Sequence, residues 1–307
     1  MPSDNPTLSQ PTALLEAVAQ QSYPTASLYV VATPIGNSAD ISLRALHVLA
    51  IAEAVACEDT RNTAQLMTRY GLHKSLIAAH QHNEHEVAEK IIARLQAGER
   101  IALVSDAGTP AVSDPGAIIV DAVRAAGLRV IPLPGASAAI SALSVSGLIN
   151  DQFYFVGFLP SKAGQREQIL QSLLTIPASM IFYEAPHRIL ESTAALCKVF
   201  GTQRRVVFAR ELTKLFEEVH RCTLGEAAGW LAQDGHREKG EYVVLVEGAQ
   251  TDADGDDVEA KRVLTILLEE LSVKQAAALA AQITGQKKNA LYQMALAMKN
   301  PQDIESQ

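Results

Sequence analysis

Residues 105–116 make an unusually long connection between an expected strand and an expected helix. They read SDAGTPAVSDPG and include two glycines, two prolines and two aspartates. Gly108 and Gly116 permit left-handed backbone or close approach, whereas Pro110 and Pro115 fix φ and remove N–H donors. We therefore expect a stiff loop that presents carbonyl oxygens and carboxylates but few N–H groups.

Such a loop favours a ligand that brings hydrogen-bond donors. An adenine amino group, an ammonium or ribose hydroxyls would suit it, whereas phosphate prefers N–H groups and positive charge. Asp106 and Asp114 add carboxylates for the same kind of ligand. A second interpretation of Asp114 stays open, because it could cap the following helix with Pro115 in the first turn.

Two other loops follow strands of the same expected sheet, ATPIGN (32–37) and PLPGASA (132–138). The first lacks both the G-x-G-x-x-G and the G-x-x-x-x-G-K-[ST] patterns. Pro34 stiffens it, Gly36 permits close approach, and Ser137 in the other loop could cap a helix. Ligands of open α/β sheets bind beyond the carboxyl ends of strands. The loops therefore predict a pocket for a neutral or cationic nucleoside-like molecule, a description that S-adenosylmethionine fits.

Short apolar strands alternate with amphipathic helices from residue 27 onward, which predicts a parallel sheet covered on both faces. A second set begins at 153–158, and adjacent strands at 205–210 and 217–222 indicate a mixed sheet. We expect a flexible tail (1–26), two α/β domains (27–148 and 149–248), an acidic linker (249–260) and a helical extension (261–307).

The linker prediction rests on five acidic residues and no basic residue in 249–260. In the extension, a Gly-containing turn separates two helices, and Lys287 and Lys288 stand at the second. This pattern is typical of a helix-turn-helix that binds nucleic acid, but also of a plain helical hairpin.

The chain has 307 residues and a net charge of −8. Residues 161–214 nevertheless hold eight Lys or Arg against four Glu, and 261–299 hold six against two. An uneven charge distribution of this kind can attract a polyanion.

Three scattered cysteines fit a reducing cytoplasm, and no apolar run is long enough to cross a membrane. No His, Cys and Asp cluster has metal-ligand spacing, so we expect no metal.

Seven motifs occur in an order and spacing that resemble the tetrapyrrole methylase superfamily: VATPIGN, CEDTRNT, HNE, LVSDAGTPAVSDPG, PLPGASA, FYEAPHR and ARELTK. The resemblance covers about residues 27–248. It implies a two-domain class III methyltransferase fold with a small C-terminal helical extension, S-adenosylmethionine between the domains, and a homodimer. It is strongest to members that methylate the ribose 2′-hydroxyl of a cytidine in the decoding region of 16S rRNA, in the 30S subunit.

Carried over position by position, the resemblance implies the residues that line the cofactor. They are Pro34, Asp106, Ala107, Gly108, Thr109, Pro110, Ser137 and Ala138, with Phe158, Tyr183 and Ala209 from the second domain.

Methyl transfer to a ribose hydroxyl needs a group that accepts the hydroxyl proton. Strand ends supply the candidates, and the base could be Glu58, Asp59, Glu84 or Glu184. Two local roles stay open, because Arg61 could simply pair with Asp59 and Glu84 could cap a helix. We hypothesise that Glu58, Asp59, Arg61, His82, Asn83 and Glu84 face the acceptor, whereas Glu184, Arg188, Arg210 and Lys214 shape the cleft and hold flanking phosphates.

Two other functions remain open. One is a methyltransferase acting on a tetrapyrrole, because a carboxylated macrocycle would also bind arginine. The other is a ribosome-maturation factor that binds RNA without catalysis, since a fold alone does not guarantee an activity.

Overall fold

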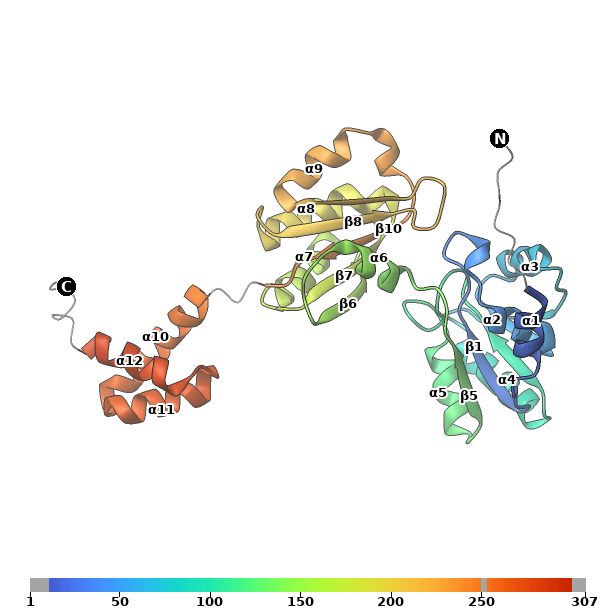
Figure 1. The fold of residues 1–307 in the computed structure, drawn as a ribbon, viewed down its shortest axis with the longest axis horizontal. Coiled ribbons are helices and arrows are strands. Elements are labelled where there is room, and N and C mark those ends of the chain that lie inside the picture. Colours follow the sequence, from blue (N-terminus) through green and yellow to red (C-terminus); the bar gives the residue numbers. More distant parts are fainter. Residues whose placement is uncertain (1–10, 250–252, 300–307) are drawn as a thin grey trace. The chain divides into compact units, whose positions relative to one another are not determined.

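The computed structural model describes residues 11–249 and 253–299. Contacts divide the chain into unit 1, residues 1–174 and 178–247, and unit 2, residues 175–177 and 248–307. Among the described residues, unit 1 contains two five-stranded sheets and unit 2 contains three helices (Figure 1). In the described ranges every helix is too short or too polar to span a bilayer.

The first sheet is wholly parallel, as predicted, and its strand order is β3-β2-β4-β1-β5. Its strands are β1 (Ser27–Val31), β2 (Ala54–Cys57), β3 (Ser75–Ala78), β4 (Arg100–Leu103) and β5 (Arg129–Leu133). The elements between them are η1 (Ser38–Asp40), α2 (Leu43–Ile51), α3 (Thr60–Arg69), α4 (Glu84–Gln96) and α5 (Ala117–Ala125).

Apolar side chains on alternate residues of these strands enter two separate cores. Leu28 and Ile101 pack with α4 and α5, whereas Tyr29 and Val55 pack with α2 and α3. Successive side chains of a strand point to opposite faces, so a strand buried on both faces reads as a continuous apolar run. The two cores confirm the prediction that helices cover both faces of the sheet.

The second sheet is mixed, as predicted, and its order is β6-β7-β10-β8-β9. Only β6 and β7 pair in parallel, while the other neighbours are antiparallel. Its strands are β6 (Phe153–Phe158), β7 (Ser179–Glu184), β8 (Arg205–Arg210), β9 (Glu218–Thr223) and β10 (Tyr242–Val246). The connecting elements are α7 (Ala163–Ser172), η2 (Pro186–Arg188), α8 (Ile189–Phe200), α9 (Leu224–Ala232) and η3 (Gly235–Glu238).

Helix α6 (Ala138–Ser146) follows the first sheet in the chain but packs on the second. Ala139 and Ala142 share one core with Ile181, Val207 and Leu245. The predicted boundary near residue 148 groups this helix with the first domain, and the structure corrects that grouping. The crossing between sheets therefore lies in the loop that precedes α6, beside the predicted ligand loops.

Unit 2 consists of α10 (Ala253–Glu270), α11 (Val273–Thr284) and α12 (Lys288–Lys299). Leu264, Ala277, Ala280, Leu291 and Ala295 form its buried core. Ser272 and Gln275 form a capping box at the start of α11, and Gly285 ends that helix in the left-handed conformation. Small alanines at the core allow the helices to approach closely.

Two predicted irregular segments contain helix. Within the tail predicted for residues 1–26, Pro11–Ala19 form α1, and residues 1–10 lie outside the described residues. Within the linker predicted for 249–260, α10 already begins at Ala253, and residues 250–252 lie outside the described part.

Candidate active site

The three loops predicted to form a pocket are joined by short-range contacts. Thr33 and Gly108 exchange two backbone hydrogen bonds, of 2.8 and 3.0 Å, and the Thr109 hydroxyl donates to the Ala136 carbonyl at 3.0 Å. A side chain at Gly135 would place its Cβ 2.7 Å from the Cβ of Ala32. The loops after β1, β4 and β5 therefore form one rigid assembly.

Left-handed backbone explains the length of the 105–116 loop. Its φ angles are 78° at Gly108, 65° at Ala111, 67° at Ser113 and 132° at Gly116. Positive φ at two non-glycine residues is strained backbone of the kind that clusters at functional sites. The loop also reaches the second sheet, because a Cβ at Gly157 would lie 3.0 Å from the Ser113 hydroxyl oxygen.

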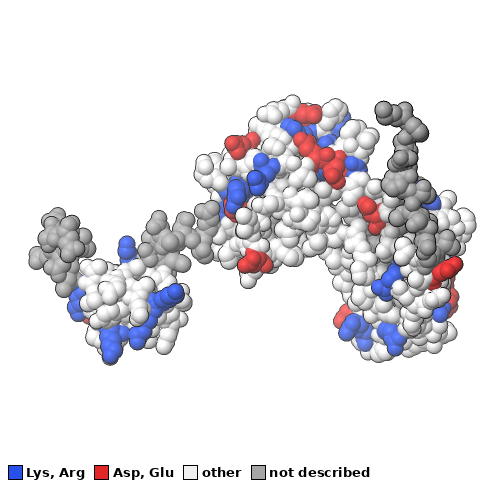
Figure 2. Space-filling view, viewed as in Figure 1, with Lys and Arg blue, Asp and Glu red and all other residues white. Residues whose placement is uncertain are grey.

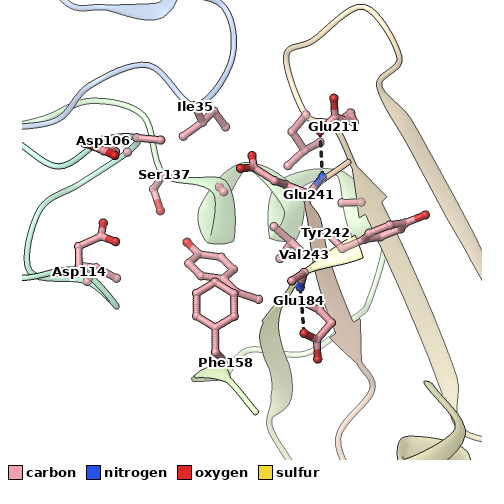
Figure 3. Close-up of a pocket in the computed structure, with 18 of the residues that line it drawn as sticks. Ile35, Asp106, Asp114, Ser137, Phe158, Glu184, Glu211, Glu241, Tyr242 and Val243 are labelled. Carbon is pink, nitrogen blue, oxygen red and sulfur yellow. Dashed lines mark hydrogen bonds between the residues drawn. The ribbon is translucent and has the colours of Figure 1, made fainter. Parts of the chain in front are cut away.

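These loops form one wall of a pocket of about 370 Å³ in unit 1, and the second sheet forms the other. Ile35, Asp106, Asp114 and Ser137 come from the first wall, and Phe158, Glu184, Glu211 and Tyr242 from the second (Figure 3). The volume lies in the range usual for small-molecule sites.

Nine of the eleven residues that the resemblance assigns to the cofactor line this pocket. Pro34 and Pro110 do not, and Pro110 is buried. The pocket-lining residues of the set are Asp106, Ala107, Gly108, Thr109, Ser137, Ala138, Phe158, Tyr183 and Ala209.

The carbonyl groups of the 105–116 loop are less available than predicted. The Ser105 and Gly108 carbonyls accept from the Thr33 hydroxyl, and the Ala107 carbonyl accepts from the Ser105 hydroxyl. Side-chain carboxylates give the pocket its acceptor character instead. Its lining includes five carboxylates, Asp106, Asp114, Glu184, Glu211 and Glu241, whereas Lys214 is the single basic residue among its described lining residues.

This lining fits S-adenosylmethionine, which carries a sulfonium, an ammonium and an adenine. Negative carboxylates attract the cationic groups. The rings of Phe158 and Tyr183, which meet edge to face with their centroids 5.6 Å apart, offer an apolar surface to the adenine. A phosphate would meet like charge in the same place.

The loop after β8 contributes Glu211, Leu212 and Lys214 to the pocket lining. The Lys214 ammonium donates to Glu211 at 2.8 Å and to Glu241 at 2.9 Å. The Thr213 hydroxyl accepts from the Asn37 N–H at 3.0 Å. A Cβ at Gly36 would lie 2.6 Å from Cγ of Lys214, so the close approach predicted for Gly36 is to this loop. The Lys214 ammonium is paired with carboxylates, which disfavours the phosphate contact predicted for it.

Carboxylates from two strand ends meet beside the pocket. Asp106 accepts from the Asp59 N–H at 3.3 Å and from the Asn62 amide at 2.8 Å. Burial raises the pKa of Glu58, as do the negative charges of Asp106 and Asp59. Arg61 and Asp59 form the local ion pair, at 3.1 Å, and hydrogen bonds from Arg61 lower the pKa of Asp59. Glu58, Asp59 and Arg61 adjoin a pocket residue but do not line the pocket.

His82, Asn83 and Glu84 lie outside the pocket lining. His82 is exposed. The Asn83 side chain stabilises the turn before α4, because it accepts a hydrogen bond from the His80 N–H and donates one to the Ala78 carbonyl. Glu84 is buried and accepts from the backbone N–H of Gly116 at 2.9 Å. It therefore caps α5, rather than its own helix α4, and positions the 105–116 loop.

Glu184 lines the pocket and is held on several sides. It is 3 % exposed and accepts from the Ser192 hydroxyl and, at 2.9 Å, from the Ala185 N–H (Figure 3). Arg188 lies 3.4 Å from it and donates to the Leu159 carbonyl at 2.5 Å. The structure therefore gives Arg188 internal partners.

Arg210 is not placed to contact RNA, contrary to the prediction. It is 8 % exposed, and its guanidinium donates to the carbonyls of Lys239 and His236, both at 2.7 Å, and of Phe216 at 3.5 Å. These bonds tie the end of β8 and the loop after it to the 236–239 segment that precedes β10. The sequence shows only a charged residue at a strand end, and the burial depends on partners 26 to 29 residues away.

Lys287 and Lys288 are exposed on unit 2, at the start of α12. Residues 272–299 contain four lysines and no acidic residue. Figure 2 shows basic side chains around the body formed by α10, α11 and α12. The placement leaves both lysines available to a polyanion.

Sequence reasoning missed the pocket residues contributed by β10. Antiparallel pairing sets Tyr242 opposite Arg210 and so brings Glu241 beside Glu211, whose carboxylate accepts from the Glu241 N–H at 2.9 Å. Nothing local in EYVVLVEG indicates that this strand inserts between two others. Ile35 and Val112 were also missed, although both lie inside motifs that were recognised.

The family model "Tetrapyrrole (Corrin/Porphyrin) Methylases" matches residues 27–228, and "RsmI C-terminal HTH domain" matches 254–299. Solved structures share the fold. The methyltransferase CobJ superposes with a TM-score of 0.55 at 21% identity, covering 72% of this chain and 94% of that one. A uroporphyrin-III-C-methyltransferase from Thermus thermophilus gives 0.51 at 19%, with the same coverage.

Curated relatives are more similar in sequence. Ribosomal RNA small subunit methyltransferase I of Pseudomonas aeruginosa is 52% identical, covering 88% of this chain and 96% of that protein. The protein of the same name from Escherichia coli O157:H7 is 49% identical, covering 88% and 94%. The chain therefore belongs to the tetrapyrrole methylase family and, within it, to the ribosomal RNA small subunit methyltransferase I group.

Proposed function

We propose that this protein transfers the methyl group of S-adenosylmethionine to the ribose 2′-hydroxyl of a cytidine in the decoding region of 16S rRNA. The observation that carries the proposal is the carboxylate-lined pocket at the carboxyl ends of the first sheet, in a chain about half identical to named rRNA methyltransferases. An acidic pocket suits a cationic methyl donor, and the family supplies the acceptor.

The residues that would hold the donor come from both walls of the pocket. Asp106 to Thr109 and Ser137–Ala138 would contact it from the first sheet, and Phe158, Tyr183 and Ala209 from the second. Pro34 and Pro110 would act indirectly by stiffening their loops. The Ala139 N–H donates to the Tyr183 hydroxyl at 3.2 Å, which fixes that ring at the start of α6.

S-adenosylmethionine supplies, when bound, a methyl group already activated by the positive sulfonium. The chain must align the acceptor oxygen with the methyl carbon and take the hydroxyl proton, and each contribution is large. Alignment can contribute about 7–11 kcal/mol, and proton transfer about 10²–10⁴-fold. The acidic group of Glu58, Asp59 and Asp106 lies at the pocket edge, where we place the acceptor ribose.

Unit 2 and the enzyme's assembly complete the proposal. Lys287 and Lys288 would bind rRNA phosphates of the 30S subunit, and this charge contact would dominate affinity.

We place the enzyme in the cytoplasm, where ribosomal subunits assemble. The apolar side chains of Ile149, Phe153 and Tyr154, exposed by 93, 50 and 49 %, support a homodimer, which light scattering would test.

A methyl-transfer assay with three substrates tests the function. Assembled 30S subunits and free 16S rRNA, both from cells that lack the enzyme, are compared with a precorrin, each with labelled S-adenosylmethionine. We expect label in 30S rRNA and none in the precorrin. Label in the precorrin alone would instead support a tetrapyrrole methyltransferase, and failure to bind S-adenosylmethionine in calorimetry would favour a non-catalytic RNA-binding factor.

A further inference from the structure

Asp114 is a pocket carboxylate to which neither the cofactor set nor the acceptor set assigns a role. It belongs to the strained end of the 105–116 loop, directly after Ser113, whose φ is 67°. It lines the pocket on the wall of the first sheet (Figure 3). Phe158, labelled in the same view, belongs to the opposite wall.

Helix capping does not account for Asp114. The N-cap residue of α5 is Gly116, which has no side chain that could cap the helix. The Gly116 N–H donates to Glu84 instead. The interpretation of Asp114 as an N-cap is therefore wrong, and its carboxylate is available for another role.

The other four pocket carboxylates have cationic or backbone N–H partners. Lys214 pairs with Glu211 and Glu241, and Glu184 is held by Ser192, Ala185 and Arg188. Asp106 accepts from the Asp59 N–H. Among the described pocket residues, Asp114 is the carboxylate with neither kind of partner. The nearby Ser105 hydroxyl lowers its pKa but donates to the Ala107 and Gly108 carbonyls.

The surroundings of Asp114 make its carboxylate a better base than an ordinary aspartate. Burial raises its pKa to about 6, the negative charges of Glu58 and Asp106 act in the same direction, and the Ser105 hydroxyl opposes them. Burial raises the pKa of the Tyr183 hydroxyl on the opposite wall, and the negative charge of Asp114 acts in the same direction. A base works best when its pKa approaches the working pH while its reactive form still dominates.

We propose that Asp114 is the catalytic base that accepts the proton of the acceptor hydroxyl during methyl transfer. The inference rests on the proposed function and names the base that the sequence left open. The hydroxyl O–H bond breaks toward the Asp114 carboxylate, and the oxygen forms a bond with the methyl carbon. The carbon–sulfur bond breaks with its electron pair on sulfur, and Asp114 later releases the proton to water.

The test compares Asp114→Asn and Asp114→Ala with wild type, and Asp121→Asn serves as the matched control because Asp121 is exposed on α5. Turnover is measured on 30S subunits from pH 5 to 9, and affinity for S-adenosylmethionine by calorimetry. We expect both Asp114 variants to lose about 10²-fold or more in kcat at neutral pH. Their affinity for S-adenosylmethionine should fall far less than their turnover, and the control should match wild type.

The pH profile gives a second readout that a merely structural role would not move. Wild-type kcat/KM should fall below about pH 6, where Asp114 becomes protonated, and this acid limb should be absent from the residual activity of Asp114→Asn. Retention of wild-type turnover, or equal loss of turnover and donor binding in both variants, would overturn the assignment. Wild-type inactivity on 30S subunits would overturn the proposed function as well, so the two failures are distinguishable.

Discussion

The buried carboxylate of Glu84 accepts a hydrogen bond of 2.9 Å from the backbone N–H of Gly116. The bond joins the first residue of α4 to the last residue of the loop that lines the pocket. It satisfies a helix-end N–H without any capping residue in the loop. The loop can therefore use its own carboxylates, Asp106 and Asp114, for the pocket.

Glu84→Ala should destabilise the protein and loosen the pocket together. Leaving the Gly116 N–H unsatisfied and buried costs about 1–3 kcal/mol. We expect a lower Tm in calorimetry and weaker binding of S-adenosylmethionine, with partial recovery in Glu84→Gln, whose amide oxygen can still accept. Glu86→Ala is the control, since Glu86 is exposed on the same helix. Unchanged donor affinity in Glu84→Ala would contradict the positioning role.

Gly36→Ala should weaken donor binding by separating two loops of the pocket. The new Cβ would lie 2.6 Å from Cγ of Lys214, 2.7 Å from the Thr213 hydroxyl and 3.0 Å from the Leu212 carbonyl. Overpacking of this kind typically costs about 1–3 kcal/mol. We expect an affinity loss of tenfold or more by calorimetry.

Gly164→Ala supplies the control for this clash. Gly164 lies in α7, and apart from its chain neighbours and the backbone of its own helix no atom stands within 4 Å of the position of its Cβ. The substitution should stabilise the protein by about 0.5–1 kcal/mol, because glycine is unfavourable within a helix. If Gly36→Ala binds the donor as tightly as Gly164→Ala, the two loops do not need their close approach.

Asp114→Asn should be at least as stable as wild type near neutral pH. The folded pKa of Asp114, about 6, exceeds its usual 3.8, so the folded state holds the proton more tightly. Its favourable contribution is complete below pH 3.8 and is lost as pH rises through about 6. Denaturant titrations at pH 5 and 7.5 measure the difference. A marked loss of stability in the variant at pH 7.5 would indicate that the charged carboxylate supports the fold.

Replacement of Lys287 and Lys288 by alanine should weaken rRNA binding without changing donor affinity. Each lost phosphate contact reduces the slope of log K against log salt by about 1. The measurement is 30S binding at several salt concentrations. Lys90→Ala is the control, because Lys90 is exposed in unit 1 and pairs with Glu86. Equal binding by all variants would remove unit 2 from the RNA interface.

The sequence predicts both sheets and the pocket loops because these features depend on local patterns. Apolar runs, Gly and Pro mark the strands and turns of the first sheet, and the motifs mark the ligand loops. Nine of the eleven expected cofactor residues consequently line the pocket.

The features that the sequence did not reveal depend on distant contacts. Arg210 is satisfied by carbonyls of the 236–239 turn, and Glu84 reaches a residue 32 positions away. Helix α6 packs on the second sheet although it follows the first, and β10 inserts between β7 and β8. No local periodicity encodes such pairings. Charged residues at strand ends, such as Arg210 and Glu84, were therefore predicted to contact substrate, whereas their hydrogen bonds hold the fold together.

Nucleoside mass spectrometry of 16S rRNA distinguishes methylation of a cytidine ribose from methylation of a base. Small subunits from cells lacking the enzyme are incubated with S-adenosylmethionine and either wild-type protein or Asp114→Asn, and the rRNA is digested to nucleosides. We expect one new 2′-O-methylcytidine per subunit with wild type and a trace with the variant. A methyl group on a base, or no new methylated nucleoside with wild type, would contradict this expectation.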